Sequence, residues 1–428
     1  MNRARPQSDR TPIGFAAITT VPARVPGIVI FGGVTRALAA LAFVLELTAC
    51  AGSPEALPPC DPAQEEAGLV FCDLRNPEDI ALLPGRAWIV VSQMARLDED
   101  PSADPASARP GDLLAVRLVD GARRRLFPPN AADPGSPWPP PPSEERWGDG
   151  ACPGPPDPAL FLPHGLDVGS DRLGRTQLAV VNHGGREAVE IFEIGARTAP
   201  SLEWRGCVPM PEGMMMNDVA WHPGGGFVVT NFSPALEGRG LRTLWTGFEI
   251  MTGRETGSVL RWTSDAGLVE IDNSRGSAPN GVAVAPDGSE IFVAEWGAKS
   301  VFRLRFDGDG EPVRDAVALE HSPDNLSWTR DGRLLVAGQG GGVLKVLGCN
   351  EIGEGACGVD YGVYSIDPVS LGARRLYDGK GAASVALEVD GEVLVGSFVG
   401  DRIERRPVSG GSASSRGSSR TDPSEEAD

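Results

Sequence analysis

Strands with alternating apolar and polar positions recur six times along the chain, and each begins with a short polar segment. A second strand follows about ten residues later, often after a turn that contains Gly, such as Pro286-Asp287-Gly288. Repetition of one strand unit at intervals of dozens of residues is typical of a radial array of small sheets. The six openings are Glu78–Ile80, His164–Leu166, Asn217–Val219, Asn280–Val282, Asp324–Leu326 and, with a weaker pattern, Ala383–Val385.

Several units supply a third strand, for example over residues 189–194 and 301–306, and some supply a fourth. We therefore predict an all-β fold, a six-bladed β-propeller with a central metal-binding channel, that occupies residues 70–407 as one domain. In such a wheel the first strand of each blade lines the channel. The residues that open these strands should therefore meet at the mouth of the channel.

Nearly all of these opening residues carry oxygen donors. Carboxylates and Asn amides without thiolates are the ligands of a hard cation, and Ca²⁺ accepts about six to eight such oxygens. Any one Asn or Asp could instead open its strand through an ordinary Asx turn. The same register in five repeats favours a calcium site. The converging residues are Glu78, His164, Asn217, Asn280, Asp324 and Asn325.

Several segments together carry a family resemblance. Residues 161–167 read Phe-Leu-Pro-His-Gly-Leu-Asp, and the next strand ends in Asn182-His183. Later openings read Asn217-Asp218, Asn280-Gly281-Val282 and Asp324-Asn325-Leu326-Ser327. In this combination the chain resembles the paraoxonase/arylesterase family of six-bladed propeller lactonases over most of residues 70–405. It resembles more distantly the gluconolactonase, senescence-marker and strictosidine-synthase-like propellers.

The resemblance implies two calcium ions, one catalytic and one deeper and structural. It also implies that His164 and His183 act as a base dyad beside the catalytic ion. We call the implied ligands of the first ion the catalytic-ion set: Glu78, Asn217, Asn280, Asp324 and Asn325. The structural-ion set comprises Asp79, Asp218 and the backbone carbonyl of Leu166.

The chemistry of such a site is hydrolysis. A substrate carbonyl is polarised by a Ca²⁺ ion with an open coordination position, which also stabilises the developing oxyanion. Ca²⁺ acidifies water weakly, so a neutral imidazole is a suitable base. We hypothesise that His164 is the base and that His183 orients it or relays the proton. A His164→Gln variant with full lactone turnover would remove His164 from this role.

The expected function is therefore an exported calcium-dependent hydrolase of lactones or aryl esters. A sugar lactonase of the gluconolactonase type is one alternative, and a noncatalytic, calcium-stabilised binding propeller is another. Ser-hydrolase, zincin and Walker motifs do not occur in the sequence. The other two histidines, His222 and His321, fall in turn and loop segments.

The N-terminal segment predicts export. A basic leader is followed by the apolar run 37–47, which is too short to span a membrane, and by Leu47-Thr48-Ala49-Cys50. This pattern resembles a bacterial lipoprotein signal, with residues 1–49 removed, Cys50 acylated as a membrane anchor and residues 50–69 as a tether. The protein would then be a periplasmic or outer-membrane lipoprotein. A plain secretory signal and a buried helix are the alternatives.

Six further cysteines agree with export, because an even number in an exported chain indicates disulfides. Sequence alone allows fifteen pairings. Short loops favour Cys60–Cys72 and Cys349–Cys357, which leaves Cys152 for Cys207. The family closes its propeller with a disulfide between the chain ends, but no cysteine follows Cys357. We therefore expect closure by strand pairing between residues near 70 and residues near 400.

The net charge and the residue composition of three segments give further predictions. A net charge of −19 argues against nucleic acid and against anionic lipid headgroups as partners. The Pro-rich segment 127–158 is expected to be an inserted loop over the first blade. Segment 233–256 has apolar residues at helical spacing and is expected to be a short amphipathic helix or lid. The tail 408–428 is expected to be disordered.

Overall fold

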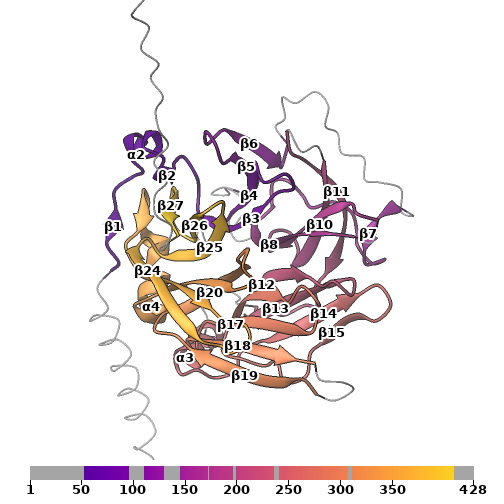
Figure 1. Ribbon diagram of the computed structural model, residues 1–428. Coiled ribbons are helices and arrows are strands. Elements are labelled where there is room, and N and C mark those ends of the chain that lie inside the picture. The colour runs from indigo at the N-terminus through magenta and orange to yellow at the C-terminus, as the bar shows by residue number, and fades with distance from the viewer. Residues whose placement is uncertain are drawn as a thin grey trace, which may run out of the picture. The chain divides into compact units, whose positions relative to one another are not determined.

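The computed structural model describes residues 53–95, 110–129, 145–171, 173–195, 199–235, 241–306 and 311–408 (Figure 1). The predicted leader, Cys50 and the tail after residue 408 lie outside these residues. Short strands and tight turns make up most of the described chain.

Six sheets are arranged around a central axis (Figure 1). Each contains four antiparallel strands, and a fifth, parallel strand extends the second sheet. The first blade consists of β3 (Pro77–Leu82), β4 (Trp88–Gln93), β5 (Asp112–Arg117) and β6 (Arg123–Phe127). The second consists of β8 (Pro163–Ser170), β9 (Thr176–Asn182), β10 (Ala188–Gly195) and β11 (Ser201–Pro209). The third consists of β12 (Met214–Trp221), β13 (Phe227–Pro234), β14 (Ser258–Thr263) and β15 (Gly267–Glu270).

The remaining blades repeat this order. The fourth consists of β16 (Pro279–Val284), β17 (Glu290–Glu295), β18 (Ser300–Arg305) and β19 (Val313–Ala318). The fifth consists of β20 (Ser322–Trp328), β21 (Leu334–Gln339), β23 (Asp360–Ile366) and β24 (Ala373–Lys380). The sixth consists of β25 (Ala383–Val389), β26 (Glu392–Ser397), β27 (Ile403–Pro407) and β2 (Val70–Phe71). The predicted six-bladed propeller is confirmed, and every blade has a fourth strand.

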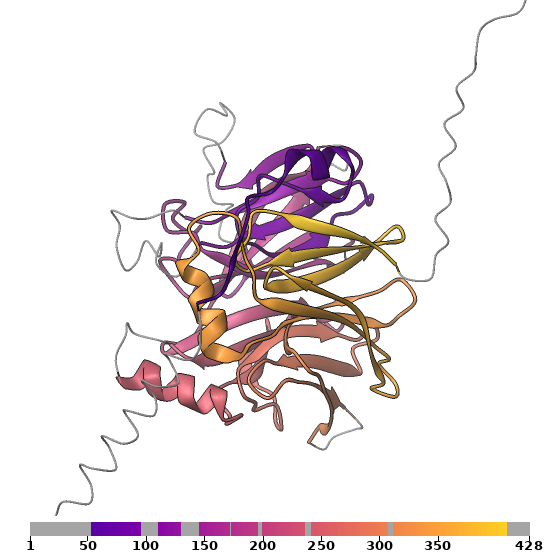
Figure 2. The ribbon, with the colours of Figure 1, turned by 90° about the vertical axis from the view of Figure 1, so that its left-hand side faces the viewer.

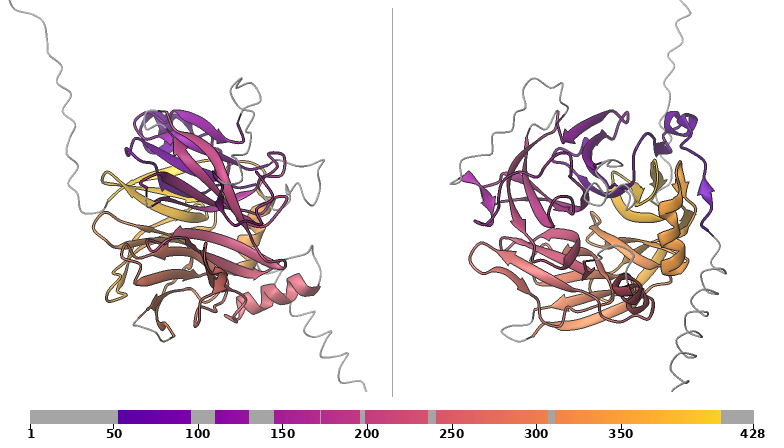
Figure 3. Two further views of the ribbon diagram at one scale, coloured as in Figure 1. Left: turned by 90° about the vertical axis from the view of Figure 1, so that its right-hand side faces the viewer. Right: turned by 180° about the vertical axis from the view of Figure 1, so that it is seen from behind.

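The propeller closes by strand pairing, as the sequence predicts. The first strands contact one another in the order β3, β8, β12, β16, β20, β25, and β25 contacts β3 again. In the sixth blade, β2 comes from the start of the propeller and pairs with β27, with Val70 opposite Glu404 and Phe71 opposite Ile403. Both ends of the propeller sequence therefore share one sheet. Figure 3 shows the closed ring from behind.

The hydrophobic core lies between neighbouring blades. Ile80 and Ile89 of the first blade pack with Val385 and Leu387 of the sixth, and similar clusters fill the other blade interfaces. Because a blade has a neighbour on each face, the inner strands are apolar on both sides, and residues 89–91 have no exposed surface. This burial explains why the second strands are continuous apolar runs.

Three disulfides have the predicted pairing, Cys60–Cys72, Cys152–Cys207 and Cys349–Cys357. Cys60–Cys72 fixes the segment that leads into β2, close to the closure of the propeller. Cys152–Cys207 joins the inserted segment to β11. In the same segment β7 (Trp147–Gly148) pairs in parallel with β11, so this end of the insert extends the second blade rather than the first.

Two helices, α3 (Leu241–Met251) and α4 (Gly342–Leu347), lie at the same face of the propeller and appear together in Figure 2. Ile250 of α3 packs with Trp296, and Val343 and Val346 of α4 complete this cluster. Large apolar side chains of α3 are exposed: Leu241, Leu244, Trp245, Phe248 and Met251.

Two short elements precede β2 in the chain, β1 (Ala56–Leu57) and α2 (Pro62–Glu66). β1 pairs with β22 (Ala356–Cys357), which follows the 3₁₀ turn Gly348–Glu351. In the part of the chain described, no helix has the length and apolar character required to cross a membrane.

Candidate metal centre and active site

The first strand of every blade carries a β-bulge at its opening. Bulges leave extra residues out of the ladder and change the direction of their side chains, and they are frequent next to active sites. The register with the second strand shifts between Pro77 and Asp79, Pro163 and Leu166, Met216 and Val219, Pro279 and Val282, Pro323 and Leu326, and Ala383 and Val385.

Seven of the ten predicted site residues lie inside these bulges. The bulged residues are Glu78, His164, Gly165, Asn217, Asp218, Asn280, Gly281, Asp324, Asn325 and Ser384. The periodic signal in the sequence is therefore a repeated local geometry, which turns one or two residues per blade out of the sheet. Five of the six blades supply a polar residue predicted to bind an ion or act as a base.

Two of the bulges need glycine because neighbouring blades approach closely there. A Cβ atom on Gly165 would lie 2.7 Å from the carbonyl oxygen of Asn217. A Cβ atom on Gly281 would lie 2.4 Å from the carbonyl oxygen of Asp324. These short approaches bring the polar residues of adjacent blades together.

The catalytic-ion set is brought together by hydrogen bonds between blades. Asn325 Nδ2 donates to Glu78 Oε1 at 2.8 Å, although the two residues come from the fifth and first blades. Asp324 is hydrogen-bonded to Asn280 of the fourth blade and accepts from Gln339 Nε2. All five residues of the set are buried.

Four oxygen atoms of this set are buried and have no hydrogen-bond partner among the described residues. A buried polar atom without a partner is rare and costs roughly 1–3 kcal/mol, so it needs an explanation. Every carboxylate and amide oxygen in this condition within the described residues belongs to the catalytic-ion set: Glu78 Oε2, Asn217 Oδ1, Asn280 Oδ1 and Asn325 Oδ1. Four unpartnered hard oxygens from four blades fit a bound Ca²⁺ ion.

The acidic members of the site repel one another in the absence of a cation. Burial raises the pKa of Glu78 well above its ordinary value, and the charges of Asp324 and Asp218 raise it further. Burial also raises the pKa of Asp324 to about 7. A divalent cation would supply the positive charge that offsets the repulsion between these carboxylates.

The two predicted base residues are in contact. His164 Nδ1 lies 3.0 Å from His183 Nε2, and His164 Nε2 lies 3.6 Å from Glu78 Oε1 of the catalytic-ion set. Burial, and then the neighbouring His183, lower the pKa of His164 well below its ordinary value. His164 is therefore a neutral imidazole at neutral pH, with one nitrogen toward Glu78 of the catalytic-ion set and the other toward His183.

A third residue adjoins the His164–His183 pair, and the sequence did not indicate it. Both carboxylate oxygens of Glu187 lie 3.0 Å from His183 Nδ1. Glu187 is four residues after His183, in the turn between β9 and β10, and no motif marks it. One signal in the sequence could have indicated Glu187: it is an acidic residue in the same short turn as a predicted catalytic histidine.

The structural-ion set lines the channel cavity, which has a volume of about 210 Å³. Asp79 accepts from the backbone N–H groups of Ile80 and Leu166, each at 2.8 Å. Asp218 accepts from the N–H groups of Val219 at 2.7 Å and Val282 at 2.8 Å. The pKa of each carboxyl group is raised well above its ordinary value, first by burial and then by a neighbouring carboxylate.

The other two histidines make different contacts. His222 Nδ1 accepts from the N–H of Gly224 in the turn after β12, at 2.9 Å. His321 Nδ1 lies 2.6 Å from the hydroxyl of Tyr364. Among the described residues, no group of three or more His, Cys, Asp and Glu side chains has the arrangement of a metal site, whereas three of the five catalytic-ion residues are Asn.

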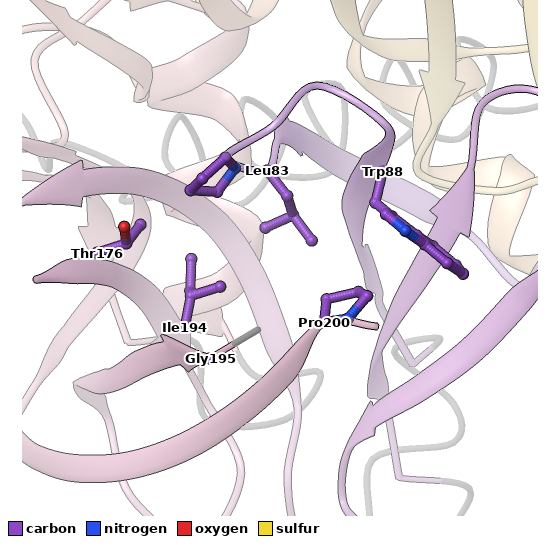
Figure 4. Close-up of a pocket in the computed structure, with 7 residues that line it drawn as sticks. Leu83, Trp88, Thr176, Ile194, Gly195 and Pro200 are labelled. Atoms are coloured by element: carbon purple, nitrogen blue, oxygen red, sulfur yellow. The ribbon is translucent and has the colours of Figure 1, made fainter. Parts of the chain in front are cut away.

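A second cavity of about 220 Å³ lies between the first two blades, away from the predicted site (Figure 4). Leu83, Trp88, Thr176, Ile194 and Pro200 line it, and the side chains of Leu83 and Ile194 point toward each other. None of the predicted site residues lines this cavity.

Residues 175–354 match the model of a family described as the SMP-30/gluconolactonase/LRE-like region. The match spans less than half of the 428 residues. It includes His183, Asn217, Asn280, Asp324 and Asn325, and it begins after His164 and the predicted ligands of the first blade. No curated protein matches the chain.

Several solved structures are similar to the chain at low sequence identity. A luciferin-regenerating enzyme is 13% identical, with a TM-score of 0.45, and the likeness covers 80% of this chain and 94% of that one. A gluconolactonase from Xanthomonas campestris is 16% identical, with a TM-score of 0.43 and coverages of 83% and 97%. A calcium-binding regucalcin from Agrobacterium tumefaciens is 12% identical, with a TM-score of 0.44 and coverages of 80% and 93%.

Proposed function

We propose that the protein is an exported calcium-dependent hydrolase of lactones or aryl esters. One observation carries this proposal: four buried oxygens of the catalytic-ion set, without a hydrogen-bond partner in the described part of the chain, lie beside a pair of hydrogen-bonded histidines. The oxygens suit a hard cation, and the histidines suit removal of a proton from water. The match to the SMP-30/gluconolactonase/LRE-like region supports a lactone as the substrate.

The residues divide the chemistry between them. Glu78, Asn217, Asn280, Asp324 and Asn325 would hold the catalytic ion, and Asp79, Asp218 and the carbonyl of Leu166 would hold a structural one. When bound, the catalytic Ca²⁺ supplies electrostatic stabilisation of the negative charge that develops on the substrate carbonyl.

The histidine pair supplies the base. His164 Nε2 faces the catalytic-ion set and accepts a proton from the attacking water, whose oxygen bonds to the acyl carbon. His183 Nε2 lies 3.0 Å from His164 Nδ1, where it orients the imidazole and takes up positive charge. The alcohol oxygen of the ester then leaves with a proton, and the products are a carboxylate and an alcohol.

A sugar lactonase of the gluconolactonase type is the second candidate, because the family match favours it. We expect the purified full-length protein to hydrolyse an aliphatic δ-lactone and phenyl acetate, to lose this activity in EDTA and to regain it on addition of Ca²⁺. Turnover of gluconolactone alone would favour the sugar lactonase. Turnover that EDTA leaves unchanged would contradict calcium dependence, and a folded, Ca²⁺-loaded protein without turnover would favour a binding propeller.

The proposal includes export and attachment to a bacterial membrane through an acylated Cys50. Three disulfides agree with an oxidising compartment. Cells fed a labelled fatty acid should incorporate the label into the wild-type protein and not into a Cys50→Ser variant, and only the wild type should remain in the membrane fraction. Equal membrane association of both proteins would contradict the anchor.

A further inference from the structure

The carboxylate of Glu187 is fixed by two kinds of contact. Both of its oxygens lie 3.0 Å from His183 Nδ1, and Oε1 also accepts the backbone N–H of Met216 at 2.6 Å. The backbone carbonyl of Glu187 accepts the N–H of Met210 at 2.9 Å. The Met216 contact lies in the third blade, so Glu187 joins the turn after β9 to the strand that carries Asn217.

The turn that carries Glu187 is built to hold one conformation. The side chain of Asn182 accepts the N–H of Leu162 at 2.9 Å and donates to the carbonyl of Gly184 at 3.0 Å. Gly185 has a φ of 73°, in the left-handed region. Because the turn is anchored at its start and at Glu187, His183 and Glu187 are held opposite each other.

These contacts determine where the protons of the two histidines lie. An ionised carboxylate only accepts hydrogen bonds, so His183 must carry its proton on Nδ1. His183 Nε2 then has the lone pair and accepts a hydrogen bond from His164 Nδ1–H, 3.0 Å away. His164 therefore has its lone pair on Nε2, the nitrogen that lies 3.6 Å from Glu78 Oε1.

We propose that Glu187 is a positioning residue that sets the tautomers of both histidines, so that His164 presents an acceptor nitrogen to the reacting water. This inference rests on the proposed function. As the water O–H bond breaks and a proton bonds to His164 Nε2, the Nδ1 proton of His164 can pass to His183 Nε2. The positive charge then lies beside the Glu187 carboxylate, which stabilises it.

Kinetics of a Glu187→Gln variant test the proposal. The amide oxygen can still accept the Met216 N–H, so the turn should keep its structure. The amide lacks the charge that stabilises a protonated His183, and kcat should fall about 10- to 100-fold, as is typical when a group that orients a catalytic ligand or base is removed. KM should change less than about threefold, because Glu187 acts through His183.

A matched control is Glu203→Gln, on β11 of the same blade. Glu203 pairs with Arg205 at 2.9 Å on the surface, and its side chain is 64% exposed. This variant should keep the wild-type kcat and KM. An unchanged kcat in Glu187→Gln, or a loss that appears only in KM, would overturn the proposal.

Nitrogen NMR of histidine-labelled protein tests the tautomers without reference to turnover. The chain has four histidines, so four His→Gln variants assign all of the signals. In Ca²⁺-loaded wild-type protein at about pH 8, where histidines are mostly neutral, His164 and His183 should both carry their proton on Nδ1. Glu187→Gln should change the His183 signals, whereas Glu203→Gln should not.

The two measurements separate failure of this inference from failure of the proposed function. A His183 protonated on Nε2 in the wild type would overturn the inference, whatever the activity. The expected tautomers in a protein that hydrolyses no lactone or ester would support the role of Glu187 in fixing the histidines and contradict the hydrolase function.

Discussion

Replacement of Glu78 by Gln should abolish calcium binding by the catalytic-ion set and lower kcat/KM for the preferred substrate by a factor on the order of 10³ or more. Glu78 Oε1 already accepts from Asn325, and Oε2 has no partner among the described residues. The amide can keep the first contact but places an N–H₂ group where a ligand oxygen is needed. Loss of the ion removes several kcal/mol of transition-state stabilisation.

The same substitution should have the opposite effect on the metal-free protein. Burial and nearby carboxylates make an ionised Glu78 costly, as its raised pKa indicates. Gln has the same shape without the charge. In EDTA the variant should therefore unfold at the same temperature as the wild type or at a higher one, whereas added Ca²⁺ should stabilise the wild type more strongly. Titration calorimetry with Ca²⁺ and thermal unfolding measure both effects.

Glu190→Gln is the matched control for this experiment. Glu190 is also fully buried, but it is paired with Arg186 at 2.6 Å and accepts from Trp204 Nε1 at 2.8 Å. Its replacement leaves the partly exposed guanidinium of Arg186 with a weaker partner and should lower stability equally with and without Ca²⁺. A Glu78→Gln variant that binds Ca²⁺ like the wild type, or that is less stable in EDTA, would contradict the assignment of Glu78.

The sequence predicted the propeller because the fold repeats one local pattern. The strand openings coincide with the bulges of the first strands, and the long apolar second strands coincide with burial on both faces. Closure between residues near 70 and residues near 400 was predictable because no cysteine is available to join the chain ends, and β2 pairs with β27. The disulfide pairing followed from short loops and elimination.

Other features depend on contacts that the sequence does not encode locally. The position of each site residue along its strand was visible, but the hydrogen bond from Asn325 to Glu78 spans 247 positions and exists only in the closed ring. Glu187 was missed because a single acidic residue in a polar turn is unremarkable until its distance to His183 is known. Helix α4 was missed because it begins at Gly342, in a run of glycines that is more typical of a turn.

The buried carboxylates also determine how stability depends on pH. Burial is the main cause of the raised pKa values of Glu78, Asp79, Asp218 and Asp324, the last to about 7. Carboxyl groups of an unfolded chain titrate near pH 4. Between about pH 4 and about pH 7 the folded metal-free protein therefore binds more protons than the unfolded protein, and its free energy of unfolding falls as pH rises.

We therefore expect the metal-free protein to be more stable at pH 5 than at pH 8, contrary to acid denaturation. Between pH 5 and its pKa of about 7, Asp324 alone accounts for roughly 3 kcal/mol, at about 1.4 kcal/mol per pH unit. The lowered pKa values of His164, His222 and His321 act in the opposite direction. Asp167 and Glu190 also have raised pKa values, so six carboxyl groups act against three histidines. Bound Ca²⁺ favours the ionised carboxylates, so the saturated protein should not lose stability over this range. Calorimetric unfolding from pH 5 to pH 8, in EDTA and in Ca²⁺, measures how the stability of each form depends on pH. A metal-free protein that gains stability steadily toward pH 8 would show that these carboxylates do not share an ion site.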